Sequence, residues 1–150
     1  MDSIIHCKAT LNCSQGQSFA MFANNAHIQT WLAQIADVEP RVGGKYELFW
    51  DADNRAVNST IGCKITAIEP DKLLCFEWKG PDQFAHFMNV ANPLTHVSVF
   101  FSPIGDGRNA TGIHLIHTGW RSDEAWAQAR AWFESVWENA LSALKKQIDN

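Results

Sequence analysis

The sequence lacks a long hydrophobic run, a basic cluster and an N-terminal secretion signal. No stretch approaches the roughly 18 apolar residues of a membrane-spanning helix, so no membrane partner is expected. Lysine and arginine are scattered and the net charge is −4, so nucleic acid and anionic membranes are not expected partners either. Because no basic segment precedes an apolar stretch at the N-terminus, we expect a cytoplasmic protein.

Metal-binding and nucleotide-binding patterns are also missing. The four cysteines form no CxxC pair and have no histidine at zinc-finger spacing, which predicts buried, reduced thiols. The six histidines are scattered, so we predict no metal and no cofactor. There is no GxSxG nucleophile motif and no P-loop, and Gly105-x-Gly107 lacks the third glycine of a dinucleotide fingerprint. No catalytic residue is assigned from a motif.

Aromatic residues, in contrast, are abundant. Seven tryptophans and nine phenylalanines occur in 150 residues, and the composition is 46% hydrophobic, which is typical of a globular protein. This length suits one domain, and we find no internal repeat or linker, so residues 1–150 are predicted to form a single domain.

Most of the chain shows the two-residue alternation of β-strands. Residues 4–13 predict a first strand, followed by two short helices, the second spanning Ile28 to Ile35. Short alternating segments then follow one another from 38 to 120, separated by polar, glycine or proline turns. Connections this short predict antiparallel neighbours. Residues 81–95 are long for a hairpin connection and carry several apolar side chains, so we interpret them as a lid or a dimer contact.

The C-terminal segment from Ser122 to Ile148 has helical periodicity with a wide apolar face. Ser122 is the predicted N-cap, and Lys145 and Lys146 suit the last turn. Only a broad element can cover such a face. The sequence therefore predicts an α+β fold, in which a curved antiparallel sheet of about six to seven strands wraps this helix and two short helices follow the first strand.

Several ordered motifs resemble one known family. They are Glu39-x3-Gly43-Gly44-x-Tyr46, Gly62-x5-Ile68-x-Pro70 leading into Phe76-x-Trp78, Thr111 to Trp120, and Trp137-x3-Leu141-x2-Leu144. Together they resemble the homologues of the activator of heat-shock protein 90 ATPase, within the START-like (SRPBCC, Bet v 1-like) superfamily. The resemblance implies a helix-grip fold. It leaves function open, because this superfamily includes ligand carriers, cyclases and a co-chaperone.

Strand and helix parity predict a group of aromatic side chains between the sheet and the long helix. We expect this space to be a cavity for a small molecule, although large aromatics also fill solid cores. The predicted lining residues are Trp31, Glu39, Tyr46, Trp50, Phe76, Trp78, Phe101, His117, Trp126, Arg130 and Phe133. We expect the cavity near the N-terminal half of the long helix, and plain packing from Trp137 onward.

Three polar residues in this set have two interpretations each. His117 is either a ligand or acid–base group, or a core histidine bonded to a backbone or tryptophan partner. Glu39 is either a base at the cavity mouth or the surface partner of Arg41 or Lys45. Arg130 either binds a ligand carboxylate or extends to water.

The first functional hypothesis is binding of a small hydrophobic or aromatic molecule in this cavity, without catalysis by the protein itself. The alternatives are a cyclase or hydrolase that uses His117 or Glu39, and a protein-interaction module of the co-chaperone type. The sequence leaves open whether the chain forms a homodimer.

Overall fold

The computed structural model describes residues 4–150. Seven strands and four helices follow one another in these residues. Their order is β1 (Ile5–Leu11), α1 (Gln15–Ala23), α2 (Asn25–Ile28), β2 (Ile35–Val38), β3 (Tyr46–Phe49), β4 (Ile65–Glu69), β5 (Leu73–Trp78), α3 (Asp82–Met88), β6 (Thr95–Pro103), β7 (Thr111–Thr118) and α4 (Glu124–Asp149).

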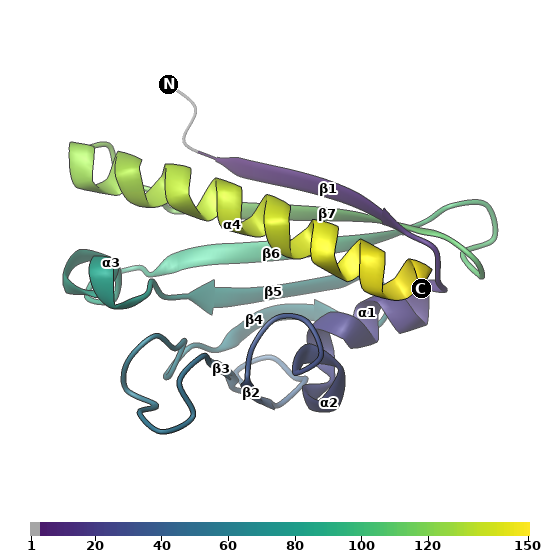
Figure 1. Cartoon of the computed structure of the whole chain (residues 1–150), viewed down its shortest axis with the longest axis horizontal. Coiled ribbons are helices and arrows are strands. Elements are labelled where there is room, and N and C mark those ends of the chain that lie inside the picture. Colours follow the sequence, from purple (N-terminus) through teal and green to yellow (C-terminus); the bar gives the residue numbers. More distant parts are fainter. Residues whose placement is uncertain (1–3) are drawn as a thin grey trace.

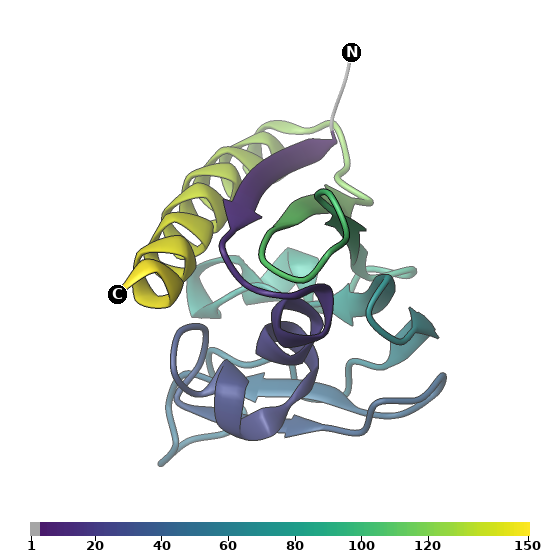
Figure 2. The same cartoon turned by 90° about the vertical axis from the view of Figure 1, so that its right-hand side faces the viewer.

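Five strands form one antiparallel sheet in the order β1-β7-β6-β5-β4. The β2–β3 hairpin forms a second sheet. Residues 45–49, which include β3, are joined to residues 59–64 by two isolated bridges and by backbone hydrogen bonds. The long helix α4 lies across the five-stranded sheet, while the hairpin and α2 lie beyond its β4 edge (Figure 1). Figure 2 shows α4 against β1 and the hairpin in a separate layer. This α+β architecture confirms the predicted fold.

The apolar face of α4 and the inward parity of the strands form one core. Its α4 members are spaced by three or four residues, as the amphipathic pattern requires. They are Trp126, Ala129, Phe133, Trp137, Leu141 and Leu144. The strand members include Ile5, Leu74, Phe76, Val97, Val99, Ile113 and Leu115. Thr95 and His117 are buried among them.

Several predicted boundaries were wrong. The second short helix ends at Ile28, and Ile35 begins strand β2 instead of closing a helix. Residues 81–95 contain the helix α3 and are therefore not a loop throughout. The N-cap of α4 is Asp123, whose carboxylate accepts a hydrogen bond from the Trp126 amide, one residue after the predicted Ser122. Within residues 4–150, no helix combines the length and the apolar character that crossing a membrane requires.

Candidate functional site

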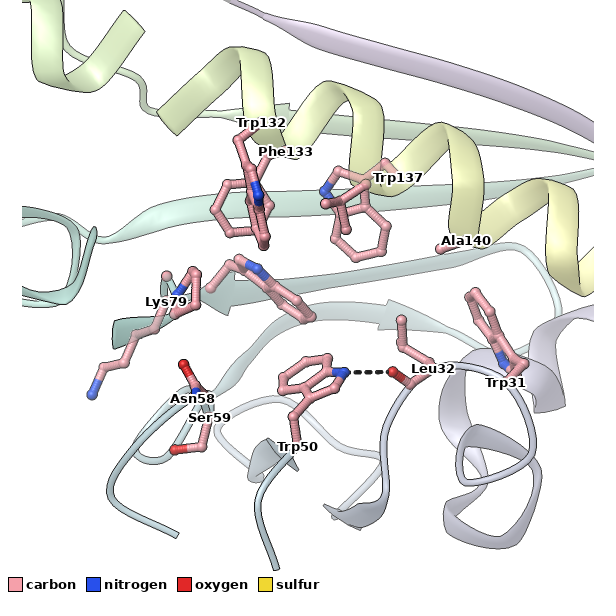
Figure 3. Close-up of a pocket in the computed structure, with 14 residues that line it drawn as sticks. Trp31, Leu32, Trp50, Asn58, Ser59, Lys79, Trp132, Phe133, Trp137 and Ala140 are labelled. Carbon is pink, nitrogen blue, oxygen red and sulfur yellow. Dashed lines mark hydrogen bonds between the residues drawn. The ribbon is translucent and has the colours of Figure 1, made fainter. Parts of the chain in front are cut away.

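A pocket of about 260 Å³ lies between α4 and the side chains of the opposite layer. Its lining comes from five separate parts of the chain. The lining residues are Trp31, Leu32, Trp50, Asn58, Ser59, Trp78, Lys79, Gly80, Pro81, Trp132, Phe133, Val136, Trp137 and Ala140. Figure 3 shows Trp132, Phe133 and Trp137 on α4 facing Trp50 across this space. The site therefore exists only in the folded chain.

One wall of the pocket is the middle of α4. Trp132, Val136 and Ala140 are spaced by four residues, and Phe133 and Trp137 form the adjacent row of the same helix. The two rows differ in depth, because Trp137 is buried whereas Trp132 is 38% exposed. The helix therefore presents a continuous aromatic and aliphatic surface that runs from the core to the mouth.

The opposite wall is built from Trp31, Trp50 and Trp78. The indole N–H of Trp50 donates to the Leu32 carbonyl at 2.8 Å (Figure 3), and that of Trp31 donates to the Met21 carbonyl at 2.8 Å. Trp50 directly follows β3 and is 41% exposed, yet this bond fixes its ring beside Trp78, at a centroid distance of 5.9 Å. These hydrogen bonds hold large apolar rings at the mouth of the pocket.

Polar side chains gather at one end of the pocket, opposite Trp31 and Ala140 (Figure 3). The Lys79 ammonium donates to the Ile61 carbonyl at 2.6 Å. The side-chain oxygen of Asn58 accepts from the backbone N–H of Asp82 at 2.8 Å. The pocket is thus apolar along most of its length and polar at one end, which is the usual arrangement in small-molecule sites.

Among the described residues, the indole N–H of Trp78 is the one buried side-chain polar group without a hydrogen-bond partner. A buried donor without an acceptor costs roughly 1–3 kcal/mol. Neighbouring atoms cover this nitrogen, so a ligand acceptor reaches it only if the Trp78 ring shifts.

His117 lies behind the pocket wall, where it is fully buried and hydrogen-bonded on both ring nitrogens. Nδ1 accepts from the indole N–H of Trp137 at 3.1 Å, and Nε2 lies 3.0 Å from the hydroxyl of Thr95. Burial, with a smaller effect from His96, lowers the pKa of His117 to about 3. The side chain therefore has the core arrangement, and it positions a tryptophan of the pocket.

The structure brings together four members of the predicted cavity set: Trp31, Trp50, Trp78 and Phe133.

Tyr46 and Phe76 do not line the pocket. Their rings are stacked at 3.7 Å and fully buried, and the Tyr46 hydroxyl donates to the Phe22 carbonyl. Burial raises the pKa of Tyr46.

The other predicted residues lie elsewhere in the molecule. Phe101 packs edge-on against Phe19 and Phe22. Trp126 contacts Phe87, and the Arg121 guanidinium lies 5.0 Å from its ring centre.

The two charged members of the predicted set have protein partners. Arg130 donates to the Ile4 carbonyl at 2.7 Å and pairs with Glu134 at 3.4 Å. Glu39 accepts a hydrogen bond from the Lys45 backbone and lies 3.8 Å from Arg41. Neither side chain lines the pocket.

Sequence reasoning missed the part of the site that lies on the middle of α4. Trp132, Val136, Trp137 and Ala140 line the pocket, so it extends into a part of the helix where only packing was predicted. The spacing of Trp132, Val136 and Ala140 was a usable signal, because residues four apart share a helix face. Asn58, Ser59 and Lys79 gave no comparable signal, since each occurs in or beside an irregular segment.

The arrangement of one long helix across a curved antiparallel sheet is the START-like helix-grip fold. The model of the family "Activator of Hsp90 ATPase homolog 1-like protein" matches residues 12–149, and the chain belongs to this family. No curated protein matches the chain in sequence.

Solved structures share this fold at low sequence identity. Protein MLL2253 from Mesorhizobium loti is 18% identical with a TM-score of 0.75, over 97% of this chain and 96% of that one. The Aha1 dimer from Colwellia psychrerythraea is 16% identical with a TM-score of 0.72, over 97% and 95%. PFC0360w, an HSP90 activator from Plasmodium falciparum, is 16% identical with a TM-score of 0.67, over 92% and 89%. Identities this low support the shared fold and leave the function of the pocket to its own residues.

Proposed function

We propose that this protein binds one small aromatic or hydrophobic molecule without catalysing a reaction on it. The molecule would occupy the pocket between α4 and the opposite wall of Trp31, Trp50 and Trp78. The observation that carries the proposal is a pocket of about 260 Å³ to which five tryptophans contribute. A cavity of about 150 Å³ accommodates benzene, so this volume suits a molecule of one or two rings. Tryptophan faces provide large contact areas and favourable ring stacking for such a ligand.

The aromatic walls are partly open instead of collapsed into a solid core. Trp50 and Trp132 remain 41% and 38% exposed, and Trp50 is held by its bond to Leu32. Large apolar side chains at a concave opening favour a binding site over plain packing. Because the bond to Leu32 holds the Trp50 side chain in place, little ordering of Trp50 is required on binding.

The chemistry of the pocket favours binding over catalysis. His117 and Glu39, the acid–base candidates, do not line it, and Lys79 is the only residue with a titratable side chain that does so among the described residues. Burial raises the pKa of Cys7 to about 11 and that of Cys63 to about 12, so neither thiol is a nucleophile at neutral pH. A protein-interaction role would not require a pocket at all.

A filled-pocket variant tests the proposal. Ala140→Phe places a ring in the pocket, whereas Ala143→Phe places the same ring on the exposed face of the same helix. We expect saturable binding of 2-naphthol, measured by titration calorimetry, in the wild type and in Ala143→Phe. Binding to Ala140→Phe is expected to weaken at least about tenfold, or roughly 1.4 kcal/mol.

Equal binding by both variants would place the probe elsewhere and refute the proposal. Absence of saturable binding to the wild type, together with no co-purifying small molecule in native mass spectrometry, would also refute it. Circular dichroism and the melting temperature of each variant report whether it is folded.

We also propose that the protein forms a homodimer. The neighbour from Colwellia psychrerythraea is described as a dimer in solution. In this chain Phe100 and Ile104 are 40% and 46% exposed on and beside β6, away from the pocket. Light scattering coupled to size-exclusion chromatography should give twice the monomer mass. A monomer mass at high protein concentration would refute this proposal and leave ligand binding unaffected.

A further inference from the structure

Lys79 is the one charged side chain among the described residues that line the pocket, and it lies at the polar end. No aspartate or glutamate of residues 4–150 lines this end. The salt bridges of the described residues do not include Lys79. Its ammonium extends from the rim, away from the aromatic rings (Figure 3), where it meets solvent and any group that projects from the mouth.

The side-chain groups at the pocket that have no partner are all hydrogen-bond donors. The Lys79 ammonium has three N–H groups and uses one on the Ile61 carbonyl. Asn58 engages its side-chain oxygen with the Asp82 amide, and its NH₂ group has no hydrogen-bond partner among residues 4–150. Such a set is complementary to a ligand that brings acceptors.

A pocket rich in tryptophan suits either a cationic or an anionic ligand, and the charge of Lys79 discriminates between the two. Aromatic cages bind quaternary ammonium and other cations through the faces of their rings. Here Lys79 would repel a cation, and no acidic side chain of residues 4–150 lines the pocket to compensate. An anion gains from the same ammonium through a charge-assisted hydrogen bond.

We propose that the ligand is an aromatic carboxylate, whose ring occupies the space between Trp50, Trp78 and α4 and whose carboxylate meets Lys79 and Asn58. The inference rests on the proposed binding function and specifies its ligand class. Carboxylate oxygens satisfy the ammonium and the amide together, and the length of the pocket beyond them is apolar. A neutral ring system would fill the pocket but leave the ammonium and the amide hydrogen-bonded to water only.

Three probes of the same shape test the charge preference. Titration calorimetry at low salt would compare 2-naphthoate, 2-naphthamide and 2-naphthylmethylammonium. We expect 2-naphthoate to bind about tenfold tighter than the amide, since hydrogen bonds to charged groups contribute about 1.5–3 kcal/mol and this site is open to water. The ammonium probe should bind most weakly, and added salt should reduce the advantage of the naphthoate.

Two near-isosteric substitutions connect that preference to the named residues. Lys79→Gln removes the charge and keeps a polar side chain with hydrogen-bond donors. Asn58→Asp keeps the oxygen that accepts from Asp82 and tolerates the positive φ of 51°, but it removes the NH₂ donors. Both variants should bind naphthoate no better than naphthamide. Lys146→Gln, with the same change in net charge on an exposed residue of α4, should retain the wild-type preference.

The outcomes separate this inference from the proposed function. Equal affinity of the wild type for naphthoate and naphthamide, with both abolished by Ala140→Phe, would overturn the carboxylate class and leave pocket binding intact. An unchanged naphthoate preference in Lys79→Gln and Asn58→Asp would also overturn it. If Ala140→Phe affects no probe, the proposed function fails and this inference fails with it.

Discussion

His117 shows how one residue determines the position of its neighbours. An indole N–H can only donate, so Trp137 requires Nδ1 of His117 to be an unprotonated acceptor, and Nε2 then carries the proton toward Thr95. The Trp120 indole donates to the backbone carbonyl of the same histidine. Charging the ring would place a proton against the Trp137 N–H. The neutral histidine therefore connects α4 to β6 and β7, directly behind the pocket wall.

The depressed pKa of His117 predicts a pH dependence of stability. Unfolded histidine has a pKa near 6.5, whereas the folded side chain titrates at about 3, so between these values the unfolded state binds a proton that the folded state does not. The free energy of unfolding should therefore fall by about 1.4 kcal/mol per pH unit from this residue as the pH drops below 6.5. Urea titrations at several pH values between 4 and 7.5 measure it.

The His117→Gln variant isolates the effect of His117, because carboxylates and His96 contribute equally to the pH dependence of both proteins. The variant should lose about 1.4 kcal/mol per pH unit of slope between pH 4 and 6, whatever its stability at pH 7.5. Identical slopes for the two proteins would show that His117 is not held neutral by the fold.

At the scale of elements, α4 combines support for the core with one wall of the pocket. Trp137 belongs to both, whereas Trp132, Val136 and Ala140 face the pocket from the more exposed side of the stripe. The length and periodicity of this helix could be predicted because a 26-residue amphipathic pattern is strong. Its exact start could not, because Ser122 and Asp123 are both good capping residues in adjacent positions.

Alanine substitutions of Ser122 and Asp123 test which of the two residues caps α4. Asp123→Ala removes the carboxylate that accepts from the Trp126 amide and should destabilise the protein by about 1 kcal/mol. Ser122→Ala should change the free energy of unfolding by less than about 0.5 kcal/mol, as for most exposed positions. Urea denaturation of both variants measures the difference. A larger loss in Ser122→Ala would move the start of the helix back by one residue.

At the scale of the whole molecule, the fold was more predictable than the site. Alternating strands with short turns imply antiparallel neighbours, and a wide helix face implies a sheet that covers it, so the architecture follows from local patterns. The pocket depends on how far the sheet bends. Strand parity placed Tyr46 and Trp50 on one face, yet Tyr46 is buried against Phe22 and Phe76 whereas Trp50 reaches the mouth. Parity gives the face of a residue but not its depth.

The NMR signals of the seven tryptophans test most directly the central claim, that a ligand binds in the pocket. Five of them line the pocket, and Trp120 and Trp126 do not. With ¹⁵N-labelled tryptophan, each indole N–H gives its own signal, and 2-naphthoate is added to saturation. We expect the signals of Trp50, Trp78 and Trp132 to move most, while that of Trp126 stays in place. If the signals of Trp120 and Trp126 move while the pocket signals stay unchanged, or if no signal moves at saturation, the result would contradict a binding site between α4 and the wall of Trp31, Trp50 and Trp78.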